Sequence, residues 1–164
     1  MARDHFIRTR LVIPRPRDEV FPFFAQAENL GRLTPPELAF RIRTPLPIAM
    51  QAGALIDYTI GLHGIPMRWR TLISEWEQPH FFVDEQLKGP YALWVHRHAF
   101  TDHPTGGTLI SDEVRYRLPL SPLSDLALPL VRRQLRRIFA YRQDAVRMLL
   151  APETRELEGA VEIT

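Results

Sequence analysis

The segment FVDEQLKGPYALWVHRHAF, residues 82–100, decides the fold, because it contains two alternating runs separated by a Gly-Pro turn. Side chains of a strand alternate between the two faces of a sheet with a period of two. The even positions therefore share one face, which carries Phe82, Asp84, Gln86, Trp94, His96, His98 and Phe100. An apolar wall with a few polar groups is typical of a small-molecule cavity. The segment predicts a β-hairpin with one face lining a pocket.

Alternating runs continue on both sides of this hairpin and predict an antiparallel sheet. The joints between the later runs are short and carry Gly or Pro, as at Gly89-Pro90 and Gly106-Gly107. Parallel strands would need crossovers of about a dozen residues or more, so consecutive strands are expected to be antiparallel neighbours. The expected strands are residues 6–13, 38–43, 55–62, 66–76, 81–87, 91–101 and 108–118.

A long helical pattern follows the last of these strands and needs a surface to cover its apolar stripe. Between residues 123 and 150, apolar side chains recur at three- and four-residue spacing, namely Leu128, Val131, Leu135, Ile138, Ala145 and Leu149. Two shorter helices are expected after the first strand, one starting near Pro16 and one over residues 28–33. A curved antiparallel sheet around the long helix is the simplest way to bury the stripe, which predicts an α+β fold.

The composition indicates one globular domain over residues 1–151. The chain has 164 residues, of which 45% are hydrophobic, enough for one core but crowded for two. No apolar stretch reaches about 18 residues and the first residues lack the layout of a signal peptide, so we expect a cytoplasmic protein without stable membrane insertion. Cysteine is absent, which excludes disulfides, thiol catalysis and cysteine-bound metals. Residues 152–164 are acidic and not periodic, which predicts a flexible tail.

Four arginines form one basic cluster within the long helical pattern. Arg132, Arg133, Arg136 and Arg137 fall on one helix face, because their spacing follows the helical repeat. No aromatic residues are interleaved and no nucleic-acid motif accompanies them, so we expect a solvated face and no nucleic-acid partner. The alternative is a partner-binding module whose association with an acidic partner weakens with salt.

The predicted order of elements resembles the helix-grip superfamily, which includes START lipid-binding domains, pollen-allergen-like proteins and polyketide aromatase/cyclases, often grouped as SRPBCC proteins. Over roughly residues 5–150, the sequence is similar to a bacterial, ligand-binding branch of that group. The similar motifs are VFPFF at residues 20–24, NL at 29–30, LTP at 33–35, WVHRH at 94–98, and Tyr116 with Pro119 before the last helix. The resemblance implies a helix-grip fold, with a cavity between the curved sheet and the long C-terminal helix.

The resemblance also implies which residues line that cavity. They would be the even-numbered residues of the hairpin, the face of the next strand that carries Ile110, Asp112, Val114 and Tyr116, and the inner face of the last helix. For the aromatic candidates, core packing and cavity lining are nearly the same prediction. The candidate ligand-binding residues are Trp69, Phe82, Asp84, Gln86, Trp94, His96, His98, Phe100, Asp112, Tyr116, Ile138 and Arg142.

Asp84, His96 and Asp112 are expected to form a carboxylate–imidazole–carboxylate row, because same-face residues of neighbouring strands lie about 4.5–5.5 Å apart at Cβ. A two-residue turn at Gly89-Pro90 would pair odd with even positions and break the row, unless a bulge restored the parity. The imidazoles could be hydrogen-bonded wall residues, ligand-recognising groups, or catalytic or metal-binding groups with either aspartate as a third ligand. We favour wall residues, and we expect no metal and no cofactor.

Arg142 falls on the apolar stripe, between Ile138 and Ala145. It either reaches into the cavity, where it meets an acidic ligand or Asp112, or it extends to the surface or pairs structurally. The second interpretation is favoured, because long basic side chains commonly bury their stems and keep the charge in water.

The residues and the resemblance together favour a non-catalytic binding protein for a small, largely apolar molecule of aromatic, polyketide-like or lipid-like character. The competing hypothesis is a cyclase- or dehydratase-type enzyme, in which His96 or His98 removes a proton next to a carbonyl while Asp84 or Asp112 tunes the imidazole. No nucleophile elbow, phosphate loop or dinucleotide fingerprint supports other enzyme classes. A small hydrophobic ligand is the expected partner, and either a monomer or a dimer fits the sequence.

Overall fold

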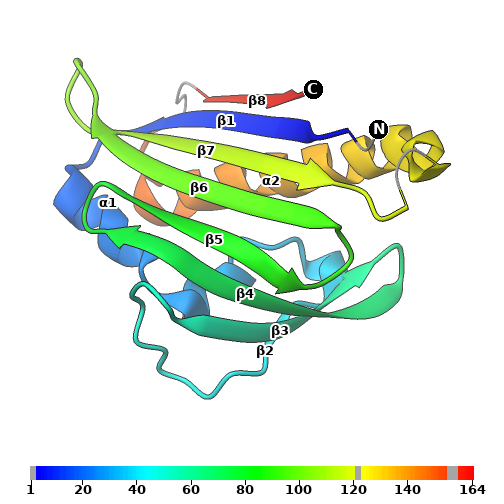
Figure 1. Cartoon of the computed structure of the whole chain (residues 1–164). Helices are drawn as coiled ribbons and strands as arrows, with labels where there is room; N and C mark the ends of the chain where they lie inside the picture. Colours follow the sequence, from blue (N-terminus) through cyan, green and yellow to red (C-terminus); the bar gives the residue numbers. More distant parts are fainter. Residues whose placement is uncertain (1–2, 121–122, 155–158) are drawn as a thin grey trace.

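The computed structural model describes residues 3–120, 123–154 and 159–164. One antiparallel sheet, in the strand order β2-β3-β4-β5-β6-β7-β1-β8, curves around a long helix, α2 (Figure 1). The α+β architecture predicted from the sequence is confirmed. The strands are β1 (His5–Ile13), β2 (Arg41–Ile42), β3 (Leu55–Leu62), β4 (Ile65–Glu77), β5 (Phe81–Lys88), β6 (Leu93–Asp102), β7 (Thr108–Arg117) and β8 (Gly159–Ile163). The helices are α1 (Arg17–Phe24) and α2 (Leu128–Leu150), with 3₁₀ turns η1 (Ala27–Gly31), η2 (Pro36–Leu38) and η3 (Leu123–Ala127).

The hairpin of β5 and β6 has the parity that places its polar residues on one face. The ladder between the two strands ends at the pair Glu85–Val95, and the residues between them, 86–94, are nine, an odd number, so even positions pair with even positions: Asp84 with His96 and Phe82 with His98. No bulge is needed. On the other side of β6, His98 pairs with Asp112 of β7. The four polar side chains therefore gather on neighbouring positions of three adjacent strands.

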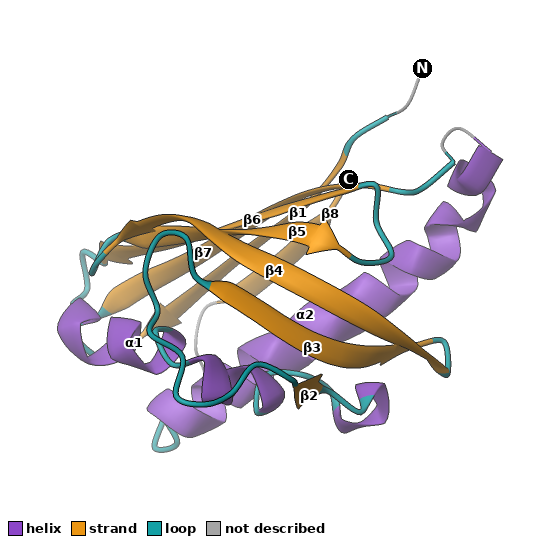
Figure 2. Cartoon of the chain, turned by 60° about the horizontal axis from the view of Figure 1, so that its bottom comes forward, coloured by secondary structure: helices purple, strands orange, loops and turns teal. Residues whose placement is uncertain are grey.

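Helix α2 covers the concave face of the sheet (Figure 2). Pro129 lies in its first turn, where a missing N–H costs no helical hydrogen bond. Leu135 and Phe139 belong to one core cluster with residues of β1, β4, β6 and β7, and Ala145 and Val146 belong to a second cluster with α1. Of the predicted apolar stripe, Leu135 and Ala145 are buried, and the other four residues are partly buried against these clusters, namely Leu128, Val131, Ile138 and Leu149.

Helix α1 closes one end of this arrangement. Pro16 precedes it, and Asp18 and Glu19 lie in its first turn, where negative charge interacts favourably with the helix dipole. Phe21 is fully buried and packs edge-on against Phe100, with ring centroids 5.1 Å apart. The apolar residues of α1 therefore cover the core at this end of the sheet.

Two expectations for the ends of the sheet were wrong. The strand predicted over residues 38–43 is reduced to Arg41–Ile42, because η2 runs to Leu38 and Ala39 adopts a left-handed backbone with φ of 44°. The end of the chain, predicted to be a flexible tail, contains β8 at residues 159–163, which pairs with β1. Residues 155–158 lie outside the described part. The alternation of Val161 and Ile163, both packed against the core, was too short to stand out in the sequence.

None of the helices within the described residues is both long enough and apolar enough to cross a membrane.

Candidate functional site

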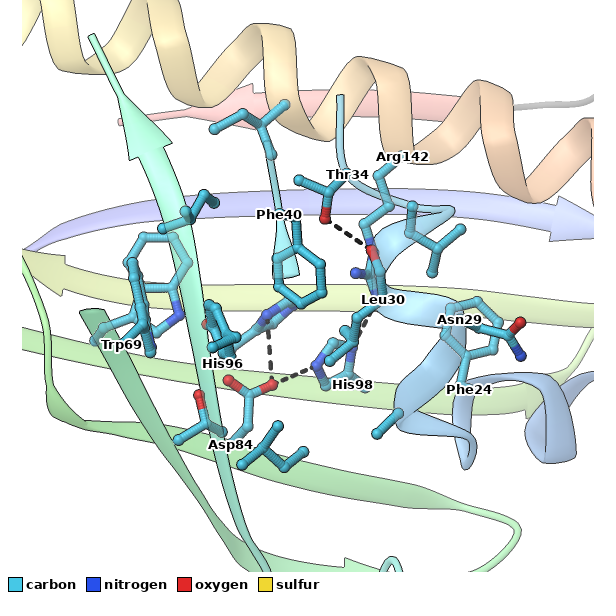
Figure 3. Close-up of a pocket in the computed structure, with 18 of the residues that line it drawn as sticks. Phe24, Asn29, Leu30, Thr34, Phe40, Trp69, Asp84, His96, His98 and Arg142 are labelled. Atoms are coloured by element: carbon cyan, nitrogen blue, oxygen red, sulfur yellow. Dashed lines mark hydrogen bonds and ion pairs between the residues drawn. The ribbon is translucent and has the colours of Figure 1, made fainter. Parts of the chain in front are cut away.

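A cavity of about 150 Å³ lies between β3–β6, α2 and the segment that follows α1 (Figure 3). Its wall is mostly apolar, formed by Phe23, Phe24, Ala27, Leu30, Leu33, Phe40, Met50, Ile56, Tyr58, Ile60, Leu62, Trp69, Ile73, Phe82, Tyr91, Trp94, Leu135, Ile138 and Phe139. The polar part of the wall consists of Gln26, Asn29, Thr34, Thr71, Asp84, His96, His98 and Arg142. This composition, apolar with a few polar groups, is typical of small-molecule sites.

An irregularity in β4 shapes the sheet side of the cavity. Trp69, Thr71 and Ile73 line the cavity from odd positions, but the pairing with β5 shifts between Ile73 and Glu75. After the shift Trp76 pairs with Phe82 and joins the core from an even position. Such a bulge bends the strand and increases its twist. It therefore helps the sheet to wrap around the cavity.

Aromatic rings form one end of the cavity. Tyr58 stacks on Trp69 with ring centroids 5.8 Å apart, and Trp69 meets Trp94 edge-on at 5.4 Å. Tyr91 closes the group, 4.8 Å from the Trp94 ring. Aromatic pairs at these separations hold one another in place by packing. This end presents an aromatic, largely apolar surface to any bound molecule.

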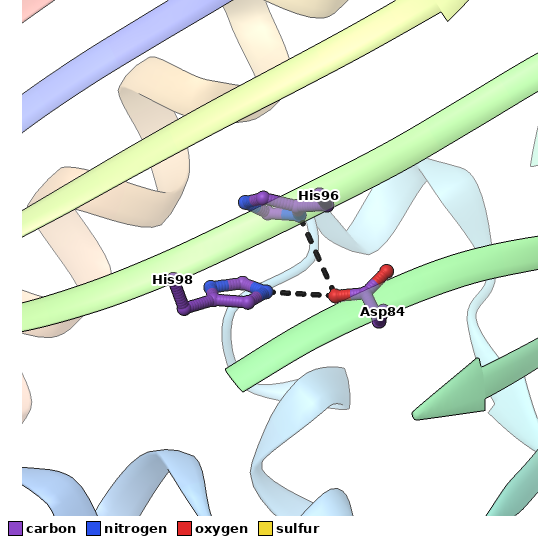
Figure 4. A group of neighbouring side chains, drawn as sticks. All are labelled: Asp84, His96 and His98. Atoms are coloured by element: carbon purple, nitrogen blue, oxygen red, sulfur yellow. Dashed lines mark hydrogen bonds and ion pairs between the residues drawn. The ribbon is translucent and has the colours of Figure 1, made fainter. Parts of the chain in front are cut away.

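Asp84, His96 and His98 project from β5 and β6 into the polar part of the cavity (Figure 4). His98 Nε2 lies 2.7 Å from Asp84 Oδ2, and His96 Nδ1 lies 3.7 Å from the same oxygen. The two imidazoles lie close together, with ring centroids 3.7 Å apart. One carboxylate oxygen is therefore shared by two imidazoles at the cavity surface.

Asp112 of β7 lies behind the two imidazoles, on the side away from Asp84. Its Oδ1 is 2.8 Å from His98 Nδ1 and 3.3 Å from His96 Nε2. Thr9 Oγ1 donates a hydrogen bond of 3.0 Å to Asp112 Oδ2, and Arg142 Nε lies 3.8 Å from that oxygen. The predicted carboxylate–imidazole–carboxylate row exists, and it contains both histidines rather than one.

The two carboxylate neighbours of His98 favour its charged form. A neutral imidazole carries one N–H only, so it would turn a lone pair toward one of the two carboxylates. Burial disfavours the charged ring, but Asp112 and Asp84 outweigh burial and raise the pKa of His98. For His96, burial and the neighbouring charge of His98 lower the pKa. Of the two rings, His98 is therefore the one that takes up a proton first as the pH falls.

Both aspartates are ionised. Burial alone would raise the pKa of Asp112, but the two imidazoles and the positive charge of Arg142 hold that pKa well below its usual range. Burial likewise opposes ionisation of Asp84, and the charges of His96 and His98 lower its pKa. Two carboxylates thus face two imidazoles and one guanidinium in a buried cluster.

Arg142 reaches inward, contrary to the interpretation favoured from the sequence. Its side chain is 14% exposed, and besides Asp112 it contacts the ring of Phe24, 5.7 Å from the guanidinium carbon to the centroid. Of the basic cluster on the same helix, Arg136 donates to the carbonyl of Val161 at 3.3 Å and Arg137 pairs with Glu37 at 3.1 Å. These arginines hold neighbouring elements to α2 as well as facing solvent.

The structure brings most of the predicted residues together. Trp69, Phe82, Asp84, Trp94, His96, His98, Ile138 and Arg142 line the cavity. Phe100, Tyr116, Ile110 and Val114 are buried in the core instead, and Asp112 lies in the layer behind the imidazoles. Gln86 lies at the far end of the hairpin, where its amide donates to the Tyr91 carbonyl at 2.7 Å and accepts from the Tyr91 N–H at 3.2 Å.

Sequence reasoning missed the cavity residues of the segment between α1 and β2. The segment after α1 contributes Asn29, Leu30 and Thr34, where the Asn29 amide donates to the Phe23 carbonyl at 2.8 Å and Thr34 Oγ1 donates to the Leu30 carbonyl at 2.7 Å. Phe40 extends into the cavity from the loop after η2. The NL and LTP motifs were a signal for this segment, but neither motif indicates which side chains point inward.

No protein-family model and no curated protein sequence matches the chain, whereas solved structures do. The Zhui aromatase/cyclase from Streptomyces sp. R1128 matches with a TM-score of 0.70 and 12% identity, over 92% of this chain and 99% of the other. Norcoclaurine synthase from Thalictrum flavum matches with 0.66 and 14%, over 93% and 97%. A START superfamily protein from Mycobacterium smegmatis matches with 0.65 and 10%, over 88% and 99%.

These similarities define the class of fold. The chain has the helix-grip fold shared by START-type and aromatase/cyclase proteins, as its sequence led us to expect. At identities this low the match concerns the fold, and function has to be argued from the site.

Proposed function

We propose that the protein binds a small, largely apolar molecule with one or two polar groups in the cavity between sheet and helix. The main support is the composition of the cavity wall, which is aromatic and aliphatic on most sides. Its charged and imidazole side chains form one cluster of Asp84, His96, His98 and Arg142. Apolar contact would supply the affinity and the polar group would set the orientation of the ligand.

The size of the cavity supports a ligand built around an aromatic ring. An apolar cavity of about 150 Å³ accepts a molecule at least as large as benzene. Burying about 200 Å² of an aromatic ring system contributes roughly 5 kcal/mol at ~25 cal/mol per Å², before the cost of association. Micromolar affinity then requires a further contribution from the polar cluster.

Filling the cavity tests this proposal. Ile60 lines the cavity, whereas Ile65, on the adjacent strand, is 62% exposed. We expect Ile60→Phe to weaken binding of the dye 1-anilinonaphthalene-8-sulfonate at least tenfold by fluorescence titration, and Ile65→Phe to leave it unchanged. Equal affinity in both variants and the parent protein would refute binding in this cavity.

A second candidate function is acid–base catalysis on a carbonyl compound, of the cyclase or dehydratase type. The placement of His96 and His98 at the cavity surface favours it, since a proton-transferring group has to reach the bound molecule. A turnover that survives the double change His96→Ala, His98→Ala would refute this candidate, provided that the variant remains folded by circular dichroism.

A further inference from the structure

Although no metal was expected from the sequence, we propose that Asp84, His96 and His98 form a binding site for one divalent transition-metal ion, open to the cavity. The three residues each offer one ligand atom, and these atoms lie within 4.8 Å of one another. With metal–ligand bonds of about 2.1 Å, ligand atoms at tetrahedral or octahedral angles lie roughly 3.0–3.4 Å apart. The separations from Asp84 Oδ2, 2.7 Å to His98 Nε2 and 3.7 Å to His96 Nδ1, bracket that range.

The backbone fixes these ligands on the rigid centre of the sheet. His96 and His98 are two residues apart on β6, so both point to the same face. Asp84 of β5 pairs directly with His96. Both histidines are buried, while the neighbouring wall opens into the cavity. Small rotations of the two rings and the carboxylate, with release to solvent of the proton that His98 Nε2 shares with Asp84, would suffice to surround an ion.

The far nitrogens of the two rings support the same inference. Histidines that bind metals usually direct their second nitrogen to a carboxylate, which fixes the ring orientation. Here both far nitrogens, His98 Nδ1 and His96 Nε2, face one carboxylate oxygen of Asp112, at 2.8 and 3.3 Å. Thr9 and Arg142 in turn hold Asp112. Asp112 is thus placed as a positioning residue behind both ligands.

Two buried atoms of the cluster face each other as an ion pair but lack a well-directed hydrogen bond. Among the described residues, His96 Nε2 and Asp112 Oδ1 are buried and make no hydrogen bond of normal geometry, which is unusual because buried polar atoms are nearly always paired. A rotation of the His96 ring that brings Nδ1 onto a metal would also redirect Nε2–H toward Asp112. One movement would satisfy both nitrogens.

The ligand set indicates the kind of ion and of bound molecule. Two imidazoles and one carboxylate, in a chain without cysteine, suit Fe²⁺, Co²⁺, Ni²⁺ or Zn²⁺ rather than Cu⁺. Three protein ligands leave coordination positions free, and these would face the cavity. The inference therefore refines the proposed function, on which this last step rests, because the bound molecule would be an apolar compound with an oxygen donor such as a carbonyl or phenolate.

Cobalt binding tests the metal site without any organic ligand. Protein freed of metals by a chelator is titrated with Co²⁺ and followed by visible absorption and by metal analysis after gel filtration. We expect one tightly bound Co²⁺ per chain, at least a tenfold loss of affinity in His98→Gln and in Asp84→Asn, and a 10–100-fold loss in Asp112→Asn. The matched control His103→Gln changes a histidine on the β6–β7 loop and should bind like the parent protein.

The outcomes separate this inference from the proposed function. Absence of stoichiometric Co²⁺ binding, or unchanged affinity in Asp84→Asn and His98→Gln, would overturn the metal site. If Co²⁺ does not bind but the protein still binds 1-anilinonaphthalene-8-sulfonate in the presence of the chelator, the metal site is refuted and the proposed ligand-binding cavity is retained. If His98→Gln does not fold, Asp84→Asn alone decides, since it preserves the volume of the side chain.

Discussion

Replacing Asp112 by Asn should destabilise the protein by about 3 kcal/mol at pH 7, within the range of roughly 3–5 kcal/mol for breaking a buried ion pair. The substitution keeps the volume and removes the charge that faces His98 at 2.8 Å and Arg142 at 3.8 Å. Asp112 is 8% exposed, so water cannot replace the lost charge. The His98 ring and the Arg142 guanidinium would then be left with the charge of Asp84.

The effect should depend on pH with a defined sign. Because the pKa of Asp112 is lower in the folded chain, its stabilisation is complete above the unfolded pKa of about 3.9 and is lost as the pH falls through the folded pKa. The parent protein should therefore lose stability on acidification below about pH 4 more steeply than Asp112→Asn does.

Urea unfolding of metal-free protein, followed by circular dichroism between pH 3 and 7, measures both effects. The matched control is Asp102→Asn, which removes an aspartate whose side chain is 74% exposed and lies 3.5 Å from Arg17, and which should cost less than ~1 kcal/mol. Equal losses in the two variants at pH 7, or parallel pH profiles for Asp112→Asn and the parent protein, would contradict the electrostatic account of the cluster.

Three further predictions concern the histidine, the last strand and the core. The pKa of His98 is raised, so the protonated His98 ring should stabilise the metal-free protein below the unfolded pKa of about 6.5, and this stabilisation should be lost as the pH rises through the folded pKa. A His98→Gln variant whose urea midpoint changes with pH as the parent's does, from pH 6 to 10, would argue against this. Gln143 donates to the carbonyls of Arg10 at 2.9 Å and Ala160 at 3.1 Å and so links β1 to β8. Gln143→Leu should lower the free energy of unfolding by about 1–3 kcal/mol and speed amide hydrogen exchange in β8. Unchanged exchange in β8 would count against this link. Phe139→Ala should cost about 3–5 kcal/mol in urea unfolding, because Phe139 is 4% exposed and packs on His96 at 5.7 Å between centroids; a loss below ~1 kcal/mol would mean that the core is built differently.

Local alternation accounts for what the sequence could predict about the site. The period of two places His96 and His98 on one face of β6, and the pairing of Asp84 with His96 across the hairpin adds Asp84 to that face. Pairing of Asp112 with the same group followed from the next short hairpin. The composition of the polar cluster was therefore readable from the sequence, although its distances and protonation were not.

The position of a residue along the curved sheet could not be predicted in this way. Phe100 and Tyr116 share the inward face with His98, yet both are fully buried in the core, because α1 and α2 cover these positions. Gln86 faces inward too, but it lies where the hairpin turns and its amide bonds to the backbone of Tyr91. Which inward residues meet the cavity depends on where the helices cross the sheet, a long-range property.

Long-range pairing also explains the missed strand and the misjudged arginine. β8 is five residues long and pairs with β1, which lies more than 140 residues earlier in the chain. No local sequence pattern therefore predicts this strand. Arg142 reaches inward because Asp112, from a distant strand, supplies the counter-charge. An apolar stripe on a helix indicates that a position faces inward, but it does not indicate whether another element supplies a counter-charge at that position.

Titration of the methyl-labelled protein with 2-naphthol, an apolar ring system with one hydroxyl, tests the cavity proposal most directly. Binding in the cavity predicts saturable shifts of the Ile60, Ile73 and Ile138 methyl signals, which line the cavity, with no change at the exposed Ile65. Absence of saturable shifts at the cavity methyls, or shifts confined to Ile65 and other exposed positions, would contradict the account.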